Sequence, residues 1–98
     1  MAKTISLTQL GVLVKNGNPV IVDIREPREF SRYHLPGAKN VPYQNLVRSP
    51  ERFIKKGEPI YIICGHGSVS YRAAQILRSF GYEAISISDG YESKAFRR

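Results

Sequence analysis

Three short apolar runs limit the folds that are open to this chain. They occupy residues 20–24, 60–64 and 84–88 and are rich in isoleucine and valine. Each run is too short for a buried helix and places apolar residues on both faces of a strand, which is typical of strands covered on both sides. Helical signals separate the runs. The pattern therefore predicts an α/β fold with a mainly parallel sheet and helices packed against it.

The first helical segment has clear end signals. Ser6 and Gln9 have the spacing of a capping box, and Gly17 is placed to end the helix. Prolines mark the start of two later segments, because proline is well tolerated in a first helical turn. Helices are expected over residues 27–35, 46–56 and 70–80, a short helix in the tail at 89–98, and at most a short strand at 40–42.

Length and charge bound the class of protein. A chain of 98 residues with 42% hydrophobic content is expected to form one globular domain over residues 1–98, and we expect a monomer. The first ten residues lack the pattern of a signal peptide or membrane span, so a cytoplasmic protein is expected. The net charge of +7 suits an anionic ligand or an acidic partner. Nucleic-acid binding is not expected, because the charges are scattered without interleaved aromatics.

The chain has a single cysteine, Cys64, so it can form no internal disulfide and no cysteine-based metal cage. His34 and His66 raise the number of possible metal ligands to three at most, and no metal is expected. The plain interpretation of a lone thiol is a small buried packing residue.

The loop around Cys64 favours a second interpretation. Cys64-Gly65-His66-Gly67-Ser68-Val69-Ser70 follows the second apolar run and leads into a predicted helix. Two glycines let the backbone turn sharply, so several N–H groups can point inward, and the helix start adds partial positive charge. Such surroundings favour a thiolate, the nucleophilic form of cysteine, with Arg72 as a candidate nearby cation. The alternative is that the glycines only make the strand-to-helix turn.

Three segments together resemble the rhodanese homology domain, in particular single-domain bacterial thiosulfate sulfurtransferases. They are Val22-Asp23-Ile24-Arg25-Glu26-Pro27-Arg28-Glu29-Phe30, His34-Leu35-Pro36-Gly37-Ala38-Lys39-Asn40-Val41-Pro42 and the Cys64 loop, and the resemblance runs from about Ser6 to Phe96. It implies a rhodanese-like three-layer fold, with a mainly parallel five-stranded sheet and helices on both faces.

The resemblance also implies a reaction. Cys64 would take a sulfane sulfur from a small anionic donor such as thiosulfate and pass it to a thiol or cyanide. The acceptor could be a thioredoxin-like or sulfur-carrier protein, and no cofactor is implied. The expected substrate-binding residues are Gly65, His66, Gly67, Ser68, Val69, Ser70 and Arg72, with hydroxyl donors from Ser68 and Ser70; Asp23, Arg25 and His34 are expected to have structural roles near the site.

Two other functions stay open at this point. The domain could be a non-catalytic rhodanese-like binding or regulatory module that uses its basic surface. It could also carry out phosphatase or arsenate chemistry on the same cysteine. Phosphatases that share this fold carry an arginine six residues after the cysteine, whereas this chain has Ser70 there, so a phosphate monoester is disfavoured.

Overall fold

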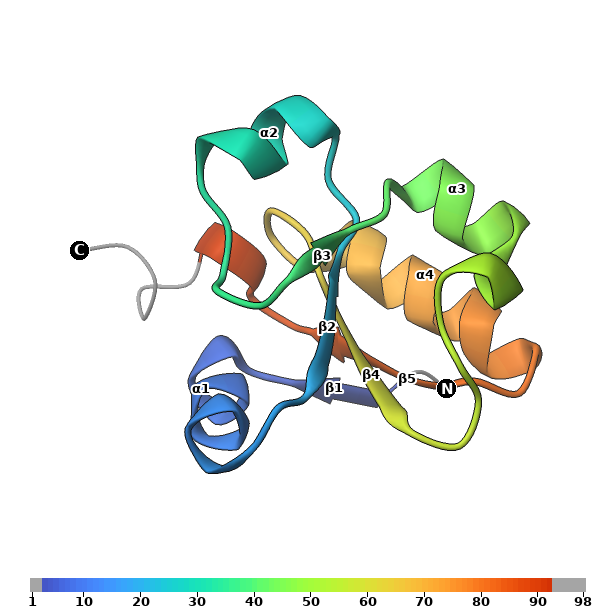
Figure 1. Ribbon diagram of the computed structural model, residues 1–98, viewed down its shortest axis with the longest axis horizontal. Coiled ribbons are helices and arrows are strands. Elements are labelled where there is room, and N and C mark those ends of the chain that lie inside the picture. The colour runs from blue at the N-terminus through green and yellow to red at the C-terminus, as the bar shows by residue number, and fades with distance from the viewer. Residues whose placement is uncertain (1–2, 93–98) are drawn as a thin grey trace.

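A five-stranded sheet forms the centre of the protein in the computed structural model, which describes residues 3–92 (Figure 1). The strand order is β1-β5-β4-β2-β3, and every neighbouring pair is parallel. The predicted α/β class and parallel sheet are confirmed. The strands are β1 (Lys3–Ile5), β2 (Val20–Asp23), β3 (Lys39–Asn40), β4 (Pro59–Ile63) and β5 (Glu83–Ile87).

Helices cover both faces of this sheet. Helix α1 packs on one face, and α3 and α4 pack on the other. Helix α2 follows the carboxyl end of β2, at the edge where the loop after β4 also lies (Figure 1). The helices are α1 (Leu7–Asn16), α2 (Pro27–Arg32), α3 (Tyr43–Arg48) and α4 (Ser68–Ser79), with 3-10 turns η1 (Pro50–Arg52) and η2 (Gly90–Glu92).

The alternation of side chains along β4 decides where the cysteine lies. Ile60 and Ile62 belong to the core under α3 and α4, whereas Ile63 belongs to the core under α1. Cys64 comes two residues after Ile62, and because strand side chains alternate between faces it joins the α4 side. The thiol is thereby directed toward the helix that begins a few residues later.

The ends of two helices show what local sequence could predict. Ser6 caps α1 as expected: its hydroxyl accepts from the Gln9 N–H at 3.1 Å, and the Gln9 side chain accepts from the Ser6 N–H at 2.7 Å. Helix α4, in contrast, begins at Ser68, two residues before the predicted start. Its N-cap is Gly67, which has no side chain to give a capping signal in the sequence.

Two segments differ from expectation at the chain ends. The edge strand β1 was not predicted from its residues, because it has only three of them and Lys3 and Thr4 are exposed. In the tail, the predicted helix over 89–98 corresponds to the 3-10 turn η2 within the described residues. The remainder of that prediction, including Phe96, lies outside residues 3–92.

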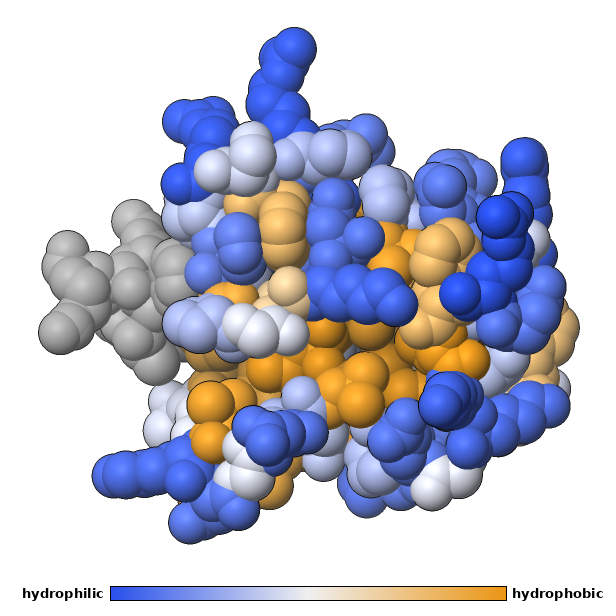
Figure 2. Space-filling view, in the orientation of Figure 1, coloured by the Kyte–Doolittle hydropathy of each residue, from blue (hydrophilic) through white to orange (hydrophobic). Residues whose placement is uncertain are grey.

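The α1 face is incompletely covered. A groove of about 330 Å³ lies between α1 and the loop before β3, lined mainly by Leu7, Leu10, Val14, Leu35 and Pro36. Figure 2 shows apolar surface exposed across this face of the molecule. No helix within residues 3–92 is long and apolar enough to cross a membrane.

Candidate active site

Cys64 lies directly after β4 and is buried, with 4% of its surface exposed. Its sulfur accepts two backbone hydrogen bonds, from the Gly67 N–H at 3.2 Å and from the Ser70 N–H at 3.3 Å. The loop after β4 therefore curls back over the thiol. Such N–H donors favour negative charge on the atom that accepts them.

The curl depends on Gly67. Its φ of +99° lies in the left-handed region, and a Cβ at this position would overlap the carbonyl oxygen of Ser88. A residue with a side chain therefore cannot take its place without moving the β5 end or the loop. Gly65, in contrast, has open space around its Cα, so only the second glycine of the motif is required on steric grounds.

Ser70 donates its backbone N–H to the Cys64 sulfur and stabilises the loop with its hydroxyl. The hydroxyl donates to the Gly67 carbonyl at 3.1 Å and lies 2.7 Å from the Ser86 hydroxyl, and both serines are fully buried. This hydroxyl is thus engaged in tying α4 to β5. The Ser68 hydroxyl is exposed and lies 3.3 Å from the Nδ1 atom of His66.

The turn η2 holds the same loop through two backbone hydrogen bonds. The Tyr91 N–H donates to the Cys64 carbonyl at 3.1 Å, and the Glu92 N–H donates to the Gly65 carbonyl at 2.8 Å. Gly90 permits this close approach, because a Cβ there would overlap those same carbonyl groups. Nothing in the local sequence indicated that η2 would contact the cysteine loop.

A cavity of about 530 Å³ opens beside the thiol. It brings together five of the residues predicted at or near the site, Arg25, Cys64, Gly65, His66 and Val69. Arg72 lies on the exposed surface of α4 and is not among the lining residues. The sequence did not single out the other lining residues as site residues: Ile24, Glu26, Glu29, Tyr43, Gln44 and Glu92.

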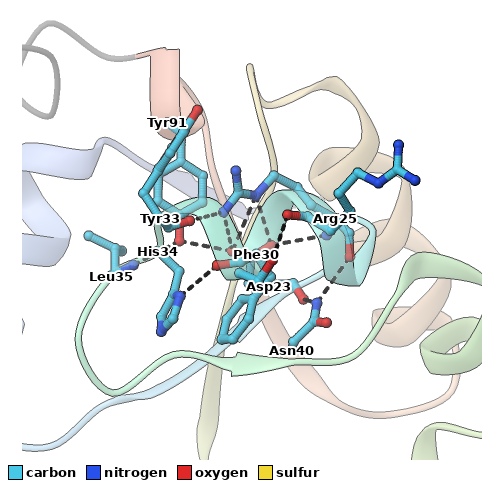
Figure 3. A network of polar contacts seen from close by, with 10 residues as sticks. Asp23, Arg25, Phe30, Tyr33, His34, Leu35, Asn40 and Tyr91 are labelled. Atoms are coloured by element: carbon cyan, nitrogen blue, oxygen red, sulfur yellow. Dashed lines mark hydrogen bonds and ion pairs between the residues drawn. The ribbon is translucent and has the colours of Figure 1, made fainter.

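A buried ion pair joins Arg25, which lines the cavity, to Asp23 (Figure 3). The Arg25 Nη2 atom lies 2.9 Å from the Asp23 Oδ2 atom and also donates to the Tyr33 carbonyl at 2.7 Å. The Tyr91 hydroxyl donates to Asp23 at 2.9 Å and accepts from the Leu35 N–H at 3.0 Å. This network joins the end of β2, the loop after α2 and η2, and η2 in turn contacts the cysteine loop.

Burial and charge alter two groups of this network. Burial raises the pKa of Tyr91, and the neighbouring Asp23 carboxylate adds to the rise, although the Leu35 N–H opposes it. For Arg25, burial acts to lower the pKa, but the hydrogen bond and charge of Asp23 outweigh it and the pKa is raised. Arg25 therefore stays cationic and bound to Asp23.

His34 follows α2, is exposed and is not among the residues that line the cavity. Its ring stacks on Phe30 with centroids 3.7 Å apart, and its Nδ1 atom lies 2.7 Å from the Phe30 carbonyl. These contacts fasten the end of α2. Within residues 3–92, no group of three histidine, cysteine or acidic residues is placed to hold a metal ion.

The sheet order, the cysteine at the β4–α4 loop and the amides around its sulfur define the class of this protein. A family model described as the rhodanese-like domain matches residues 6–93. The chain belongs to this family.

Three similar proteins illustrate the membership. The thiosulfate sulfurtransferase GlpE of Tolumonas auensis is 34% identical over 89 residues, which are 90% of this chain and 83% of that protein. The protein YqhL of Bacillus subtilis is 36% identical over 73 residues, 74% of this chain and 57% of that protein. The solved structure of the human single-domain sulfurtransferase TSTD1 has a TM-score of 0.85 at 26% identity, covering 100% of this chain and 99% of that one.

Proposed function

We propose that this protein is a sulfurtransferase that carries a sulfane sulfur on Cys64. The observation that carries the proposal is the pair of backbone N–H groups, from Gly67 and Ser70, that point at the Cys64 sulfur inside a cavity. Family membership and the sulfurtransferase names of two similar proteins support it. Thiosulfate is the first donor to test.

The first step loads the cysteine. The Cys64 thiolate attacks the outer sulfur of thiosulfate, and a new S–S bond forms while the original S–S bond breaks. Sulfite leaves with the electron pair of the broken bond, and Cys64 becomes a persulfide. Backbone N–H donors suit this step, because they stabilise negative sulfur without offering a side-chain proton that the anion could remove.

The second step unloads it. An acceptor thiolate, or cyanide, attacks the terminal sulfur of the persulfide, and the S–S bond to Cys64 breaks with its electron pair returning to the Cys64 sulfur. The acceptor leaves as a persulfide or as thiocyanate. Because Cys64 is the sole cysteine of the chain, no second thiol of the same chain can resolve the persulfide, and the sulfur must pass to another molecule.

Mass spectrometry after incubation with thiosulfate tests the first step. We expect an increase of about 32 Da on the peptide that contains Cys64, the mass of one added sulfur. The Cys64→Ser protein should show no such increase and should form no thiocyanate from thiosulfate and cyanide. A serine variant that forms thiocyanate at the parental rate would rule out the proposed role of Cys64.

A further inference from the structure

The cavity over Cys64 is acidic although the protein as a whole is basic. Its lining includes three carboxylates, Glu26, Glu29 and Glu92. The cationic lining residue, Arg25, is paired with Asp23, so that pair contributes no net charge. Among the described residues, no lysine or arginine forms an ion pair with any of the three glutamates. The other titratable groups of the lining are His66, Tyr43 and the Cys64 thiol itself.

The local sequence of α2 explains how this charge arises on a basic protein. Glu26 and Glu29 are three residues apart and therefore share one side of the helix start, which faces the cavity. Arg28 and Arg32 belong to the same helix, and neither lines the cavity. The segment thus contributes two acidic side chains and no lysine or arginine from α2 to the cavity lining.

The third carboxylate comes from another part of the chain. Glu92 belongs to η2, and its N–H is fixed to the Gly65 carbonyl at 2.8 Å. This hydrogen bond holds the residue beside the cysteine loop. The three exposed glutamates therefore line the cavity from two segments that are distant in sequence.

From this arrangement we infer that the site prefers an acceptor thiol that carries positive charge. The inference rests on the proposed sulfur transfer and concerns its second step. A thiol that enters the cavity meets the carboxylates before it meets the persulfide, so a cationic thiol is attracted and an anionic one is repelled. The cavity volume of about 530 Å³ accommodates a small aminothiol or the cysteine of a basic peptide.

Single-turnover transfer from the loaded protein tests this preference. Cys64 is loaded with inorganic polysulfide, excess reagent is removed, and loss of the added sulfur is followed by mass spectrometry. The acceptors are three thiols of similar size and different charge: cysteamine, 2-mercaptoethanol and 2-mercaptoethanesulfonate. Each rate is divided by the rate with the uncharged thiol, so that differences between proteins report charge rather than general damage.

The informative variant replaces Glu26, Glu29 and Glu92 with glutamine. The ratio of the cysteamine rate to the 2-mercaptoethanesulfonate rate should be higher in the parent protein than in this variant by about tenfold or more, which is in the range of electrostatic steering. Raising the salt concentration from about 20 mM to about 500 mM should remove most of that advantage, because the three carboxylates are exposed and are screened.

A matched control makes the same change of net charge elsewhere. Glu51, Glu58 and Glu83 are exposed and do not line the cavity; Glu58 and Glu83 lie at the opposite, amino-terminal edge of the sheet. Their triple glutamine variant should keep the parental preference. If both triple variants keep it, or both lose it equally, the preference does not arise from the cavity entrance and the inference is wrong.

Two further outcomes separate the inference from the function on which it rests. If Cys64 takes up no sulfur from polysulfide or thiosulfate, the proposed function itself fails. If Cys64 is loaded and the three thiols react without regard to charge in the parent, only the inference fails. Peptides with a cysteine between two lysines show which kind of cationic thiol is the acceptor. If the acceptor is a basic protein segment, these peptides should react faster than cysteamine. If it is a small aminothiol, cysteamine should react faster.

Discussion

At the scale of single residues, the two glycines of the cysteine loop have different duties. Gly67 has a φ of +99° and no room for a Cβ, whereas Gly65 has no such restriction. The motif Cys-Gly-His-Gly predicts a turn rich in glycine, but it does not say which glycine the backbone requires. That distinction depends on the carbonyl of Ser88, which reaches Gly67 from the end of another strand.

Alanine substitutions measure the difference. Gly67→Ala should lower the free energy of unfolding by about 3 kcal/mol, because it combines a left-handed backbone with an overlap against Ser88. Gly65→Ala should lower it by less than about 1 kcal/mol. Urea denaturation of both variants checks the prediction. Equal losses in the two proteins would contradict the assignment of the steric restriction to Gly67.

At the scale of elements, the two capped helices illustrate when local sequence suffices. The cap of α1 consists of side chains three residues apart, so the sequence alone predicts its start correctly. The start of α4 depends on the left-handed conformation of Gly67 and on contacts with β5, which local patterns do not contain. The same reasoning applies to β1, whose pairing with β5 is set by tertiary contacts rather than by its own residues.

Removal of the α1 cap provides an element-scale prediction. Ser6→Ala leaves the Gln9 N–H without its side-chain acceptor, so the free energy of unfolding should fall by about 1 kcal/mol. Sulfur loading of Cys64 should be unaffected in the folded protein, because α1 packs on the face opposite to the thiol. Denaturation together with mass spectrometry of loaded protein checks both parts. A loss of loading in fully folded variant protein would show that α1 influences the cysteine loop.

At the scale of the whole molecule, the cavity could not be predicted from the sequence because its residues come from distant segments. Cys64 and its loop were recognisable from a local motif, and so were Asp23 and Arg25. The acidic lining of the cavity could not be recognised in this way, because Glu26 and Glu92 are distant in sequence and the fold brings them to the same cavity. The net charge of +7 even suggested an anionic ligand, and the structure shows that the charge beside the thiol has the opposite sign.

The Tyr91 hydroxyl joins these distant segments, and Tyr91→Phe tests how much they depend on it. The substitution leaves the Leu35 N–H without its acceptor and removes one of the donors to Asp23, which keeps those from Arg25, so the free energy of unfolding near pH 8 should fall by about 1–3 kcal/mol. Urea denaturation of the two proteins measures this loss.

The same pair of proteins predicts a dependence on alkaline pH. Because the pKa of Tyr91 is raised in the folded state, the unfolded chain loses this proton first as the pH rises through its ordinary value of 10.0. The unfolded state then binds fewer protons than the folded state, so the stabilisation is complete below that pH and declines above it. The difference in the free energy of unfolding between the parent and the Tyr91→Phe protein should therefore become smaller above pH 10. A difference that stays constant to pH 11 would contradict the raised pKa.

The support that η2 gives to the cysteine loop has a practical consequence for spectroscopy. The amide protons of Tyr91 and Glu92 end on the carbonyl oxygens of Cys64 and Gly65, although neither donor belongs to the loop. The chemical shifts and hydrogen-exchange rates of these two amides should therefore change when the conformation of the cysteine loop changes. Sulfur loading can be followed at these two amides in solution without attaching a label to the only thiol.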